Sequence, residues 1–235
     1  MAENHTEDAV SHFSGHAREF HAYYRDRPDF QERLDLWGRL LDKYRTPGGL
    51  SIDMGCGTGV FSFYLAEKGG TVVGIDGAPG MVTFCEEQRL QRGLANLSFK
   101  EGRLPLVDTS GLGEADLVIS SSVVEYVPDL EASLALFSRL LKPGGALILS
   151  MPNLWCINRI VERARHAVTG APHIYQHILH FTSPARLRTR MQRVRLALLE
   201  VHYYDHHTRL ARMTRALQLP PALTEDLFVA VFRKQ

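Results

Sequence analysis

The residues most able to do chemistry gather in one glycine-rich run. The run reads DMGCGTG over residues 53–59, and a second acidic residue, Asp76, follows 17 residues after the last glycine. Glycines let the backbone approach a ligand closely and adopt positive φ, and a helix that starts after such a turn offers free N–H groups. An acidic side chain after the next strand can accept both hydroxyls of a ribose. The run therefore indicates a ligand that contains a ribose.

The spacing of the glycines distinguishes between nucleotide ligands. A dinucleotide site carries G-x-G-x-x-G, but the sixth position is Val60 when counted from Gly55 and Ser62 when counted from Gly57. This departure counts against NAD or FAD. The run instead fits D-x-G-x-G-x-G and resembles motif I of the class I S-adenosylmethionine-dependent methyltransferases, which bind no pyrophosphate there.

Three further segments carry the same resemblance. GIDGAPGM (74–81) is similar to the family's second acidic motif, and ADLVISSSVVEYVPD (115–129) resembles its fourth-strand motif, with Tyr126 where histidine is common. LLKPGGALILSMPN (140–153) looks like the signature before strand five. The resemblance implies S-adenosyl-L-methionine as cofactor and S-adenosyl-L-homocysteine as product. It implies these cofactor-binding residues: Asp53, Gly55, Cys56, Gly57, Gly59, Asp76, Gly77, Met81, Arg103, Leu104, Ser120, Ser121 and Tyr126.

The segment after the third predicted strand departs from the family. Many relatives carry Gly-Asp-Ala there, with the aspartate accepting from the adenine amino group. This chain has Glu101-Gly102-Arg103-Leu104. The acceptor for the adenine is therefore either Glu101 or backbone groups near Arg103.

Aromatic residues near the N-terminus suggest a lid. Phe13, Phe20 and Tyr24 recur at helical spacing, and HFSGHAREFHAYY (12–24) is similar to the N-terminal helix of UbiG-like small-molecule methyltransferases, which closes over the cofactor. By default such residues form the core face of an amphipathic helix. As a lid they would also attract a sulfonium cation through their rings.

Three histidines are candidates for acid–base chemistry. His173, His177 and His180 recur at steps of four and three, so a helix would align them on one face. No cysteine or acidic third ligand accompanies them, and we predict no metal site. A hydroxyl acceptor must lose its proton as it attacks, and we take His177 or His180 as the candidate base. An amine or an acidic phenol would need positioning alone.

The elements that position these residues alternate along the chain. Two amphipathic helices, broken near Arg27-Pro28, are predicted between residues 11 and 44. Strands are predicted at 50–54, 71–75, 96–100, 116–120, 145–151, 196–204 and 227–232, with helices at 60–68, 81–92, 130–141, 154–168 and 184–191. Short apolar strands separated by helices predict a doubly wound α/β sheet. The resemblance implies a Rossmann-like, seven-stranded, mostly parallel sheet whose last strand is antiparallel.

The length of 235 residues suits one domain with decorations. We divide it into a helical N-terminal lid (1–46), a cofactor-binding core (47–153), a helical acceptor-binding segment (154–195) and C-terminal strands (196–235). The chain shows neither an 18-residue apolar run nor a secretory signal, and its three cysteines are widely spaced. These features predict a cytoplasmic protein without a membrane span.

Charge divides the chain into two unlike parts. Residues 1–150 carry 14 Lys and Arg against 21 Asp and Glu, and residues 151–235 carry 13 against 5. Arg186, Arg188, Arg190, Arg193 and Arg195 surround apolar residues at helical spacing, which favours a solvated helix face. The alternative is a basic surface, with Arg159, Arg163 and Arg165, for a phosphate-bearing acceptor, a carrier protein or RNA.

The family resemblance favours O-methylation of a small molecule by a monomer or homodimer. N- or C-methylation, a tRNA or protein methyltransferase, and a non-catalytic S-adenosylmethionine-binding protein remain as alternatives. The chain has no Asn/Asp-Pro-Pro-Tyr run, which is typical of enzymes that methylate amino groups of adenine or glutamine, and no Pro-Cys pair. No separate RNA-binding domain is visible, so a nucleic-acid partner is not predicted.

Overall fold

A seven-stranded sheet forms the centre of the computed structural model, which describes residues 15–105, 107–171, 173–205 and 208–235. The strands lie in the order β3-β2-β1-β4-β5-β7-β6. β7 pairs antiparallel with both β5 and β6, and the other pairs are parallel. This confirms the predicted mostly parallel, doubly wound sheet. The strands are β1 (Leu50–Met54), β2 (Thr71–Asp76), β3 (Leu97–Glu101), β4 (Ala115–Ser120), β5 (Leu141–Pro152), β6 (Leu196–Tyr204) and β7 (Leu227–Lys234).

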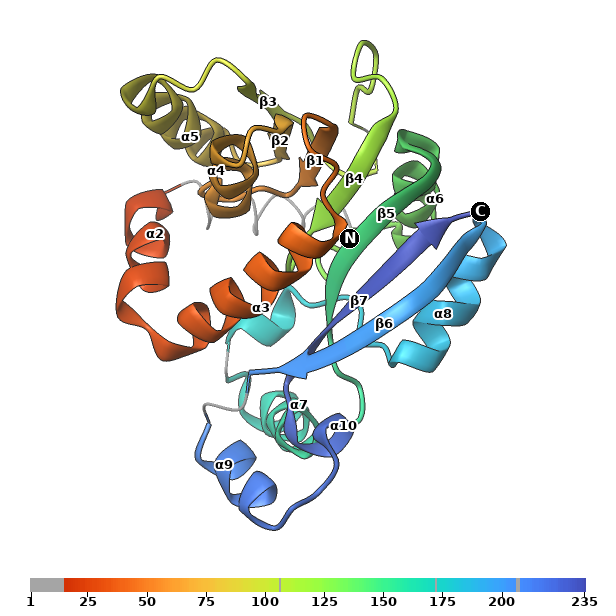
Figure 1. Ribbon diagram of the computed structural model, residues 1–235. Coiled ribbons are helices and arrows are strands. Elements are labelled where there is room, and N and C mark those ends of the chain that lie inside the picture. The colour runs from red at the N-terminus through yellow and green to blue at the C-terminus, as the bar shows by residue number, and fades with distance from the viewer. Residues whose placement is uncertain (1–14, 106, 172, 206–207) are drawn as a thin grey trace.

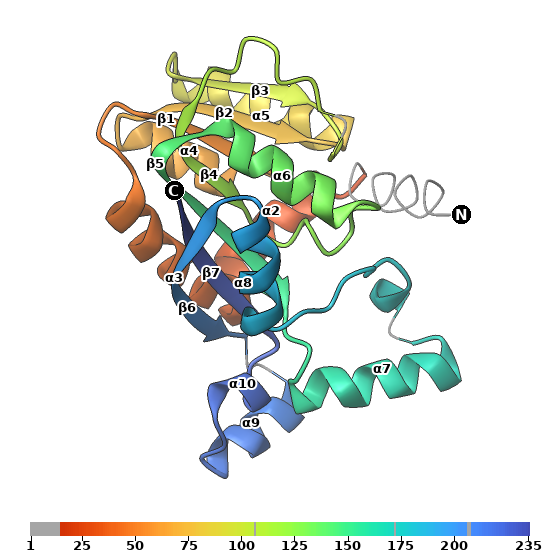
Figure 2. The same ribbon diagram turned by 90° about the vertical axis from the view of Figure 1, so that its right-hand side faces the viewer.

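Helices cover both faces of the sheet. Figures 1 and 2 show α3 (Pro28–Tyr44), α4 (Val60–Glu67) and α5 (Pro79–Arg92) on one face, and α6 (Leu130–Leu140) and α8 (Pro184–Arg193) on the other. Alternate residues of β4 point to opposite faces of the sheet. Leu117 and Ile119 pack in the core beneath α3 and α4, and Val118 packs in the core beneath α6. Burial on both faces is the reason that the central strands are apolar throughout.

The N-terminal helices bend sharply before the sheet begins. α2 (Ala17–Asp26) and α3 meet at Arg27, and Pro28 opens α3, confirming the predicted break. Proline fits this first helical position because its missing N–H has no partner there anyway. Ala17 packs with Ala78 and Met81, so α2 lies against the start of α5. Phe13 lies outside the described residues.

The last third of the chain contains more helix than the periodicity predicted. α7 (Ile157–Thr169), α9 (Arg209–Ala216) and α10 (Pro221–Thr224) gather at one end of β6 and β7, as Figure 1 shows. We predicted neither α9 nor α10. The short 3₁₀ helix η1 (His173–Gln176) follows α7.

The helix that would align His173, His177 and His180 does not form. η1 ends at Gln176, and the stretch that follows is held by other backbone groups. The N–H groups of Leu179 and His180 donate to the Glu125 carbonyl at 2.8 and 3.2 Å. These bonds replace the i to i−4 bonds of a helix, so the two later histidines do not share a helical face.

Candidate functional site

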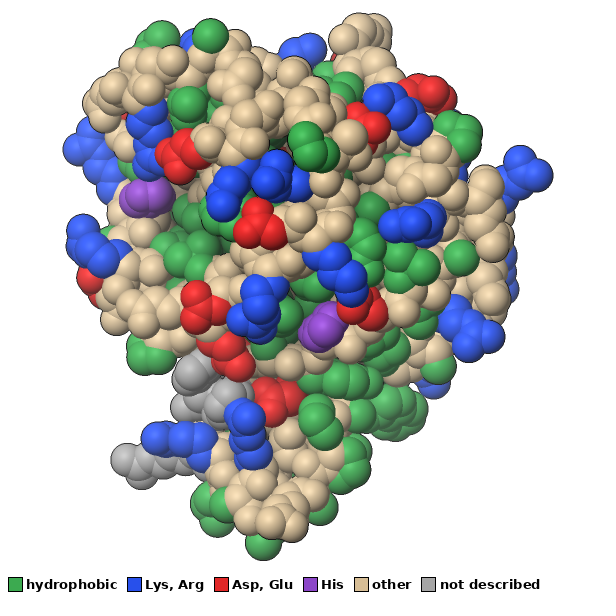
Figure 3. All heavy atoms as spheres, in the orientation of Figure 1, with side chains coloured by type: hydrophobic (Ala, Val, Ile, Leu, Met, Phe, Trp, Pro, Cys, Tyr) green, Lys and Arg blue, Asp and Glu red, His purple; other side chains and the backbone are tan. Residues whose placement is uncertain are grey.

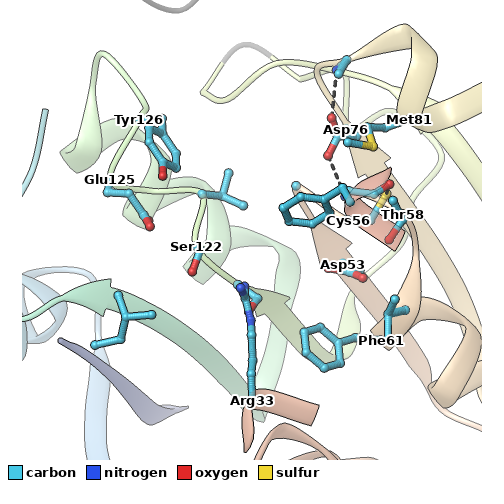
Figure 4. Close-up of a pocket in the computed structure, with 18 of the residues that line it drawn as sticks. Arg33, Asp53, Cys56, Thr58, Phe61, Asp76, Met81, Ser122, Glu125 and Tyr126 are labelled. Atoms are coloured by element: carbon cyan, nitrogen blue, oxygen red, sulfur yellow. Dashed lines mark hydrogen bonds between the residues drawn. The ribbon is translucent and has the colours of Figure 1, made fainter. Parts of the chain in front are cut away.

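A cavity of about 560 Å³ lies beyond the carboxyl ends of the central strands. Open α/β sheets bind ligands at this position. Figure 4 shows one wall with Asp53, Asp76 and Met81, and an opposite wall with Glu125 and Tyr126. The first wall comes from the glycine turn and the β2–α5 connection, and the second from the loop after β4. The volume falls within the usual range for small-molecule pockets, about 300–1,000 Å³.

Two glycines of the turn are required for different reasons. Gly55 has φ +75°, and a Cβ there would lie 2.2 Å from Cγ2 of Val123, so packing requires glycine. Gly57 also has positive φ, +53°, but its Cβ would meet no protein atom within 4 Å. Since Gly57 lines the cavity, the space beside it is available to a ligand.

The carboxylate of Asp76 fixes the turn and reaches the cavity. It accepts hydrogen bonds from the N–H groups of Gly57 and Ala78, each at 2.8 Å. Burial raises the pKa of Asp76. An ionised carboxylate has about four acceptor positions, so the two backbone bonds leave others for ligand hydroxyls. Asp76 thus holds the backbone of the turn and of the segment before α5, and it keeps acceptor positions for the predicted ribose contact.

Other polar groups of the turn are also buried. Ser62 Oγ donates to Asp53 Oδ2 at 2.6 Å, and burial raises the pKa of Asp53 to about 7. Within the described residues, Thr58 Oγ1 is buried without a hydrogen-bond partner, and Thr58 lines the cavity. Hydrogen bonding with the Cys85 thiol and burial raise the pKa of Cys56, which does not suit a nucleophile.

Arg33 places a buried cation beside the turn, and sequence reasoning missed it. The residue is 9% exposed, and its Nε and Nη2 donate to Ser121 Oγ at 3.1 and 2.5 Å. Figure 4 shows the side chain reaching between the two walls. The signal was present in the sequence, because Arg33 falls on the buried stripe that continues through Leu36, Trp37 and Leu40.

The opposite wall carries a buried carboxylate that sequence reasoning also missed. Glu125 is 2% exposed, and its Oε2 has no hydrogen-bond partner among the residues that the structure describes. Burial raises its pKa to about 7. Arg159 of α7 lines the same end, where its Nη1 donates to Tyr175 Oη at 3.0 Å. Arg159 therefore lines the cavity, whereas the alternative in the sequence analysis placed it on a basic surface.

The cavity brings together most of the predicted site residues. Those that line it are Phe20, Tyr24, Asp53, Gly55, Cys56, Gly57, Asp76, Gly77, Met81, Arg103, Leu104, Ser121 and Tyr126. Gly59, Ser120 and Glu101 are not among its lining residues. Gly59 has φ +73°, and its added Cβ would lie 2.9 Å from Phe63. Gly59 thus has a packing role.

The candidate bases His177 and His180 do not line the cavity either. Nε2 of His180 lies 2.9 Å from the Val127 carbonyl oxygen, and Nε2 of His177 lies 2.9 Å from Nε2 of Gln176. The structure thus does not bring either ring to the space where an acceptor would bind. Among the described residues, no cluster of three or more metal-ligating side chains occurs.

Comparisons with known proteins agree with this geometry. Residues 46–188 match a family model described as a methyltransferase domain. The chain is 31% identical over 176 residues to a ubiquinone biosynthesis O-methyltransferase of Xanthomonas oryzae pv. oryzae, covering 72% of this chain and 70% of that protein. It is 39% identical over 120 residues to nocamycin O-methyltransferase of Saccharothrix syringae, covering 48% and 42% respectively.

Solved structures share the fold. Magnesium protoporphyrin IX methyltransferase from Synechocystis, crystallised with S-adenosylhomocysteine, aligns with a TM-score of 0.67 at 18% identity, over 87% of this chain and 83% of that one. No helix within the described ranges is both long and apolar enough to cross a membrane.

Proposed function

The chain belongs to the class I S-adenosylmethionine-dependent methyltransferases, and we propose that it methylates a hydroxyl oxygen of a small molecule. The observation that carries the proposal is one cavity lined by Asp76 and Arg33, which suit the cofactor, and by Glu125 on the opposite wall. Similarity to two relatives named as O-methyltransferases supports oxygen as the methylated atom.

The residues on the first wall fit the cofactor. When bound, S-adenosylmethionine supplies a methyl group made electrophilic by a positively charged sulfur. Asp76 would accept the ribose hydroxyls, and the open space at Gly57 would admit the ligand close to the backbone. Met81, 2% exposed on the same wall, would pack on the adenine. Backbone groups near Arg103 suit the adenine edge better than Glu101, since Glu101 does not line the cavity.

Arg33 would bind the carboxylate of the cofactor's methionine part. A buried guanidinium is stabilised by an anion, and in the described structure its hydrogen bonds reach only the Ser121 hydroxyl. The aromatic side chains of Phe20 and Tyr24 lie on the same side, with ring centroids 6.1 Å apart. They would attract the cationic sulfur and exclude water, which is the lid role that we propose for residues 1–46.

The acceptor would lie toward Glu125 and the segment after β5. Arg159 and Ile178, both within residues 154–195, line that end of the cavity, which supports the proposed acceptor-binding segment. A macromolecular acceptor is less favoured, because Arg190 of the basic segment pairs with Glu131 at 2.7 Å. Figure 3 also shows positive and negative side chains mixed over the face in view. The proposal includes a cytoplasmic location and a monomer or homodimer.

Incubation with S-adenosylmethionine labelled in its methyl group, together with a metabolite extract, tests this function. Mass spectrometry identifies the compound that gains the methyl, and NMR of that product identifies the atom that carries it. We expect a methyl ether, formed by the wild type but not by Asp76→Ala. A labelled amine or carbon would contradict O-methylation, and label in the tRNA or protein fraction would contradict a small-molecule acceptor. Cofactor binding without transfer to any fraction would favour a non-catalytic role.

A further inference from the structure

Glu125 is held in place by backbone bonds that come from a distant part of the chain. Its carbonyl accepts from the N–H groups of Leu179 and His180 at 2.8 and 3.2 Å. The neighbouring Val124 is fully buried, and Tyr126 N–H donates to the Val123 carbonyl at 2.9 Å. The backbone of the loop after β4 is thereby tied to the segment after η1 at Glu125.

One oxygen of the Glu125 carboxylate, Oε2, has no hydrogen-bond partner among the described residues. Oε2 is buried, although the side chain lines the cavity. Leaving a buried polar group unpaired costs free energy, because its hydrogen bonds to water are lost and not replaced. A ligand that donates a hydrogen at this point would recover that free energy. In Figure 4, Glu125 lies across the cavity from Asp76 and Met81.

The surroundings of Glu125 restrict the chemistry of such a ligand. Val127, Pro152, Ile178 and Leu227 line the cavity with it and offer apolar side chains. A carboxylate acceptor has no hydrogen to donate to Oε2, although Arg159 lines the same end of the cavity. A hydroxyl on an apolar skeleton suits both the unpaired oxygen and the apolar walls.

The charges that face Glu125 permit proton exchange near neutral pH. Burial raises the pKa of Glu125 to about 7, while a hydrogen bond from its own backbone N–H and the charges of Arg33 on α3 and Arg159 on α7 act in the opposite direction. Burial also raises the pKa of the adjacent Tyr126, whose phenol therefore stays protonated at neutral pH. A base whose pKa lies near the working pH is the most effective proton acceptor.

We propose that Glu125 accepts the proton of the acceptor hydroxyl, and that the acceptors are phenols or alcohols on an apolar skeleton. The proposal rests on the proposed O-methyl transfer. As the acceptor oxygen bonds to the methyl carbon, the carbon–sulfur bond breaks and its electron pair stays on sulfur. The hydroxyl proton passes to Oε2 of Glu125, and the products are a methyl ether and a protonated Glu125 that returns its proton to water. The candidate bases His177 and His180 take no part.

Turnover by Glu125→Gln is the first test, with Glu114→Gln, an exposed site, as the matched control. Catechol, benzoate and benzylamine are the probe acceptors. We expect wild type and control to methylate catechol, and Glu125→Gln to be 10²- to 10⁴-fold slower at pH 7. The variant should lose the rise in rate that the wild type shows up to about pH 7. Unchanged rate and pH profile in Glu125→Gln, or transfer to benzoate or benzylamine in preference to catechol, would overturn the proposal.

NMR provides a readout that needs no turnover. Protein labelled with ¹³C in the glutamate side-chain carboxyl is titrated with acid in complex with S-adenosylhomocysteine, and Asp53 stays invisible because only glutamate carries the label. We expect one signal, absent from Glu125→Gln, with a midpoint near pH 7 that catechol displaces and benzoate does not. A signal that titrates in the ordinary range and that catechol leaves unmoved would overturn the proposal. Failure of the wild type to bind S-adenosylhomocysteine would overturn the proposed function instead.

Discussion

Replacing Gly57 by alanine tests whether the ligand lies against the glycine turn, because the effect on ligand affinity can be measured separately from the effect on stability. Gly57 has φ +53° and lines the cavity, and an added Cβ would meet no protein atom within 4 Å. Gly48 provides a matched control, since it has φ +69°, equally open surroundings and no place in the cavity. Both substitutions introduce the same kind of backbone strain, but only Gly57→Ala places a methyl group where the cofactor would lie.

The expected magnitudes follow from these two facts. A left-handed backbone costs a non-glycine residue about 1–2 kcal/mol. For a chain of this size that corresponds to a fall of about 2–8 °C in Tm for either variant. A methyl group forced into a filled site costs about 1–3 kcal/mol more. The affinity of Gly57→Ala for S-adenosylhomocysteine should therefore fall about 5- to 150-fold, while that of Gly48→Ala should stay at the wild-type value.

Differential scanning calorimetry measures the first effect and isothermal titration calorimetry the second. The Gly57 N–H that bonds Asp76 is retained in the variant, so the comparison isolates the added methyl group. Wild-type affinity in Gly57→Ala would refute the placement of the ligand against the turn. A fall in Tm much larger than that of Gly48→Ala would refute the open space beside Gly57.

Three further predictions address the charged groups and the core. Because burial raises the pKa of Glu125 from its ordinary 4.5 to about 7, the folded chain binds more protons than the unfolded chain between these values, and this group's contribution to stability falls as pH rises. Glu125→Gln should thus raise the free energy of unfolding by roughly 3 kcal/mol at pH 9 but by under about 1 kcal/mol at pH 5. Urea unfolding at the two pH values measures this difference, and equal effects at both would contradict the raised pKa. Arg33→Met should weaken S-adenosylhomocysteine binding about 10-fold or more and leave 5′-methylthioadenosine, which has no carboxylate, unaffected; equal losses for both ligands would exclude the carboxylate contact. Trp37→Ala removes a fully buried ring stacked on Phe61 with ring centroids 4.9 Å apart, and it should destabilise the protein by about 3–5 kcal/mol. Thermal unfolding compares it with Leu90→Ala at an exposed site, and equal losses of stability in the two variants would contradict the prediction.

The sheet and the cavity wall at the glycine turn could be predicted because their signals are local. The glycines, Asp53 and Asp76 lie at fixed spacing around one strand–turn–helix unit, and apolar runs mark the strands on either side. Positive φ at Gly55 and Gly57 and the partly buried position of Asp76 agree with that pattern. What they bind in this chain remains a prediction that the calorimetry addresses.

The opposite wall, at Glu125, could not be predicted in the same way because long-range contacts create it. The backbone N–H groups of Leu179 and His180, more than 50 residues further along the chain, bond to the Glu125 carbonyl and help to place its loop. The histidine spacing suggested a helix, but bonds to the Glu125 carbonyl hold that stretch in another conformation. The sequence suggested Arg159 only as part of a possible basic surface, yet it lines the cavity and donates to Tyr175. Such burial depends on residues far away in the sequence.

Titration of the protein with S-adenosylhomocysteine tests the central claim most directly. The wild type should bind one equivalent, and Asp76→Ala should bind none, because the carboxylate that accepts the ribose hydroxyls and pins the Gly57 and Ala78 N–H groups is lost. Far-ultraviolet circular dichroism confirms that the variant is folded. Wild-type affinity in folded Asp76→Ala would contradict the ribose assignment, and absence of binding by the wild type would contradict the account as a whole.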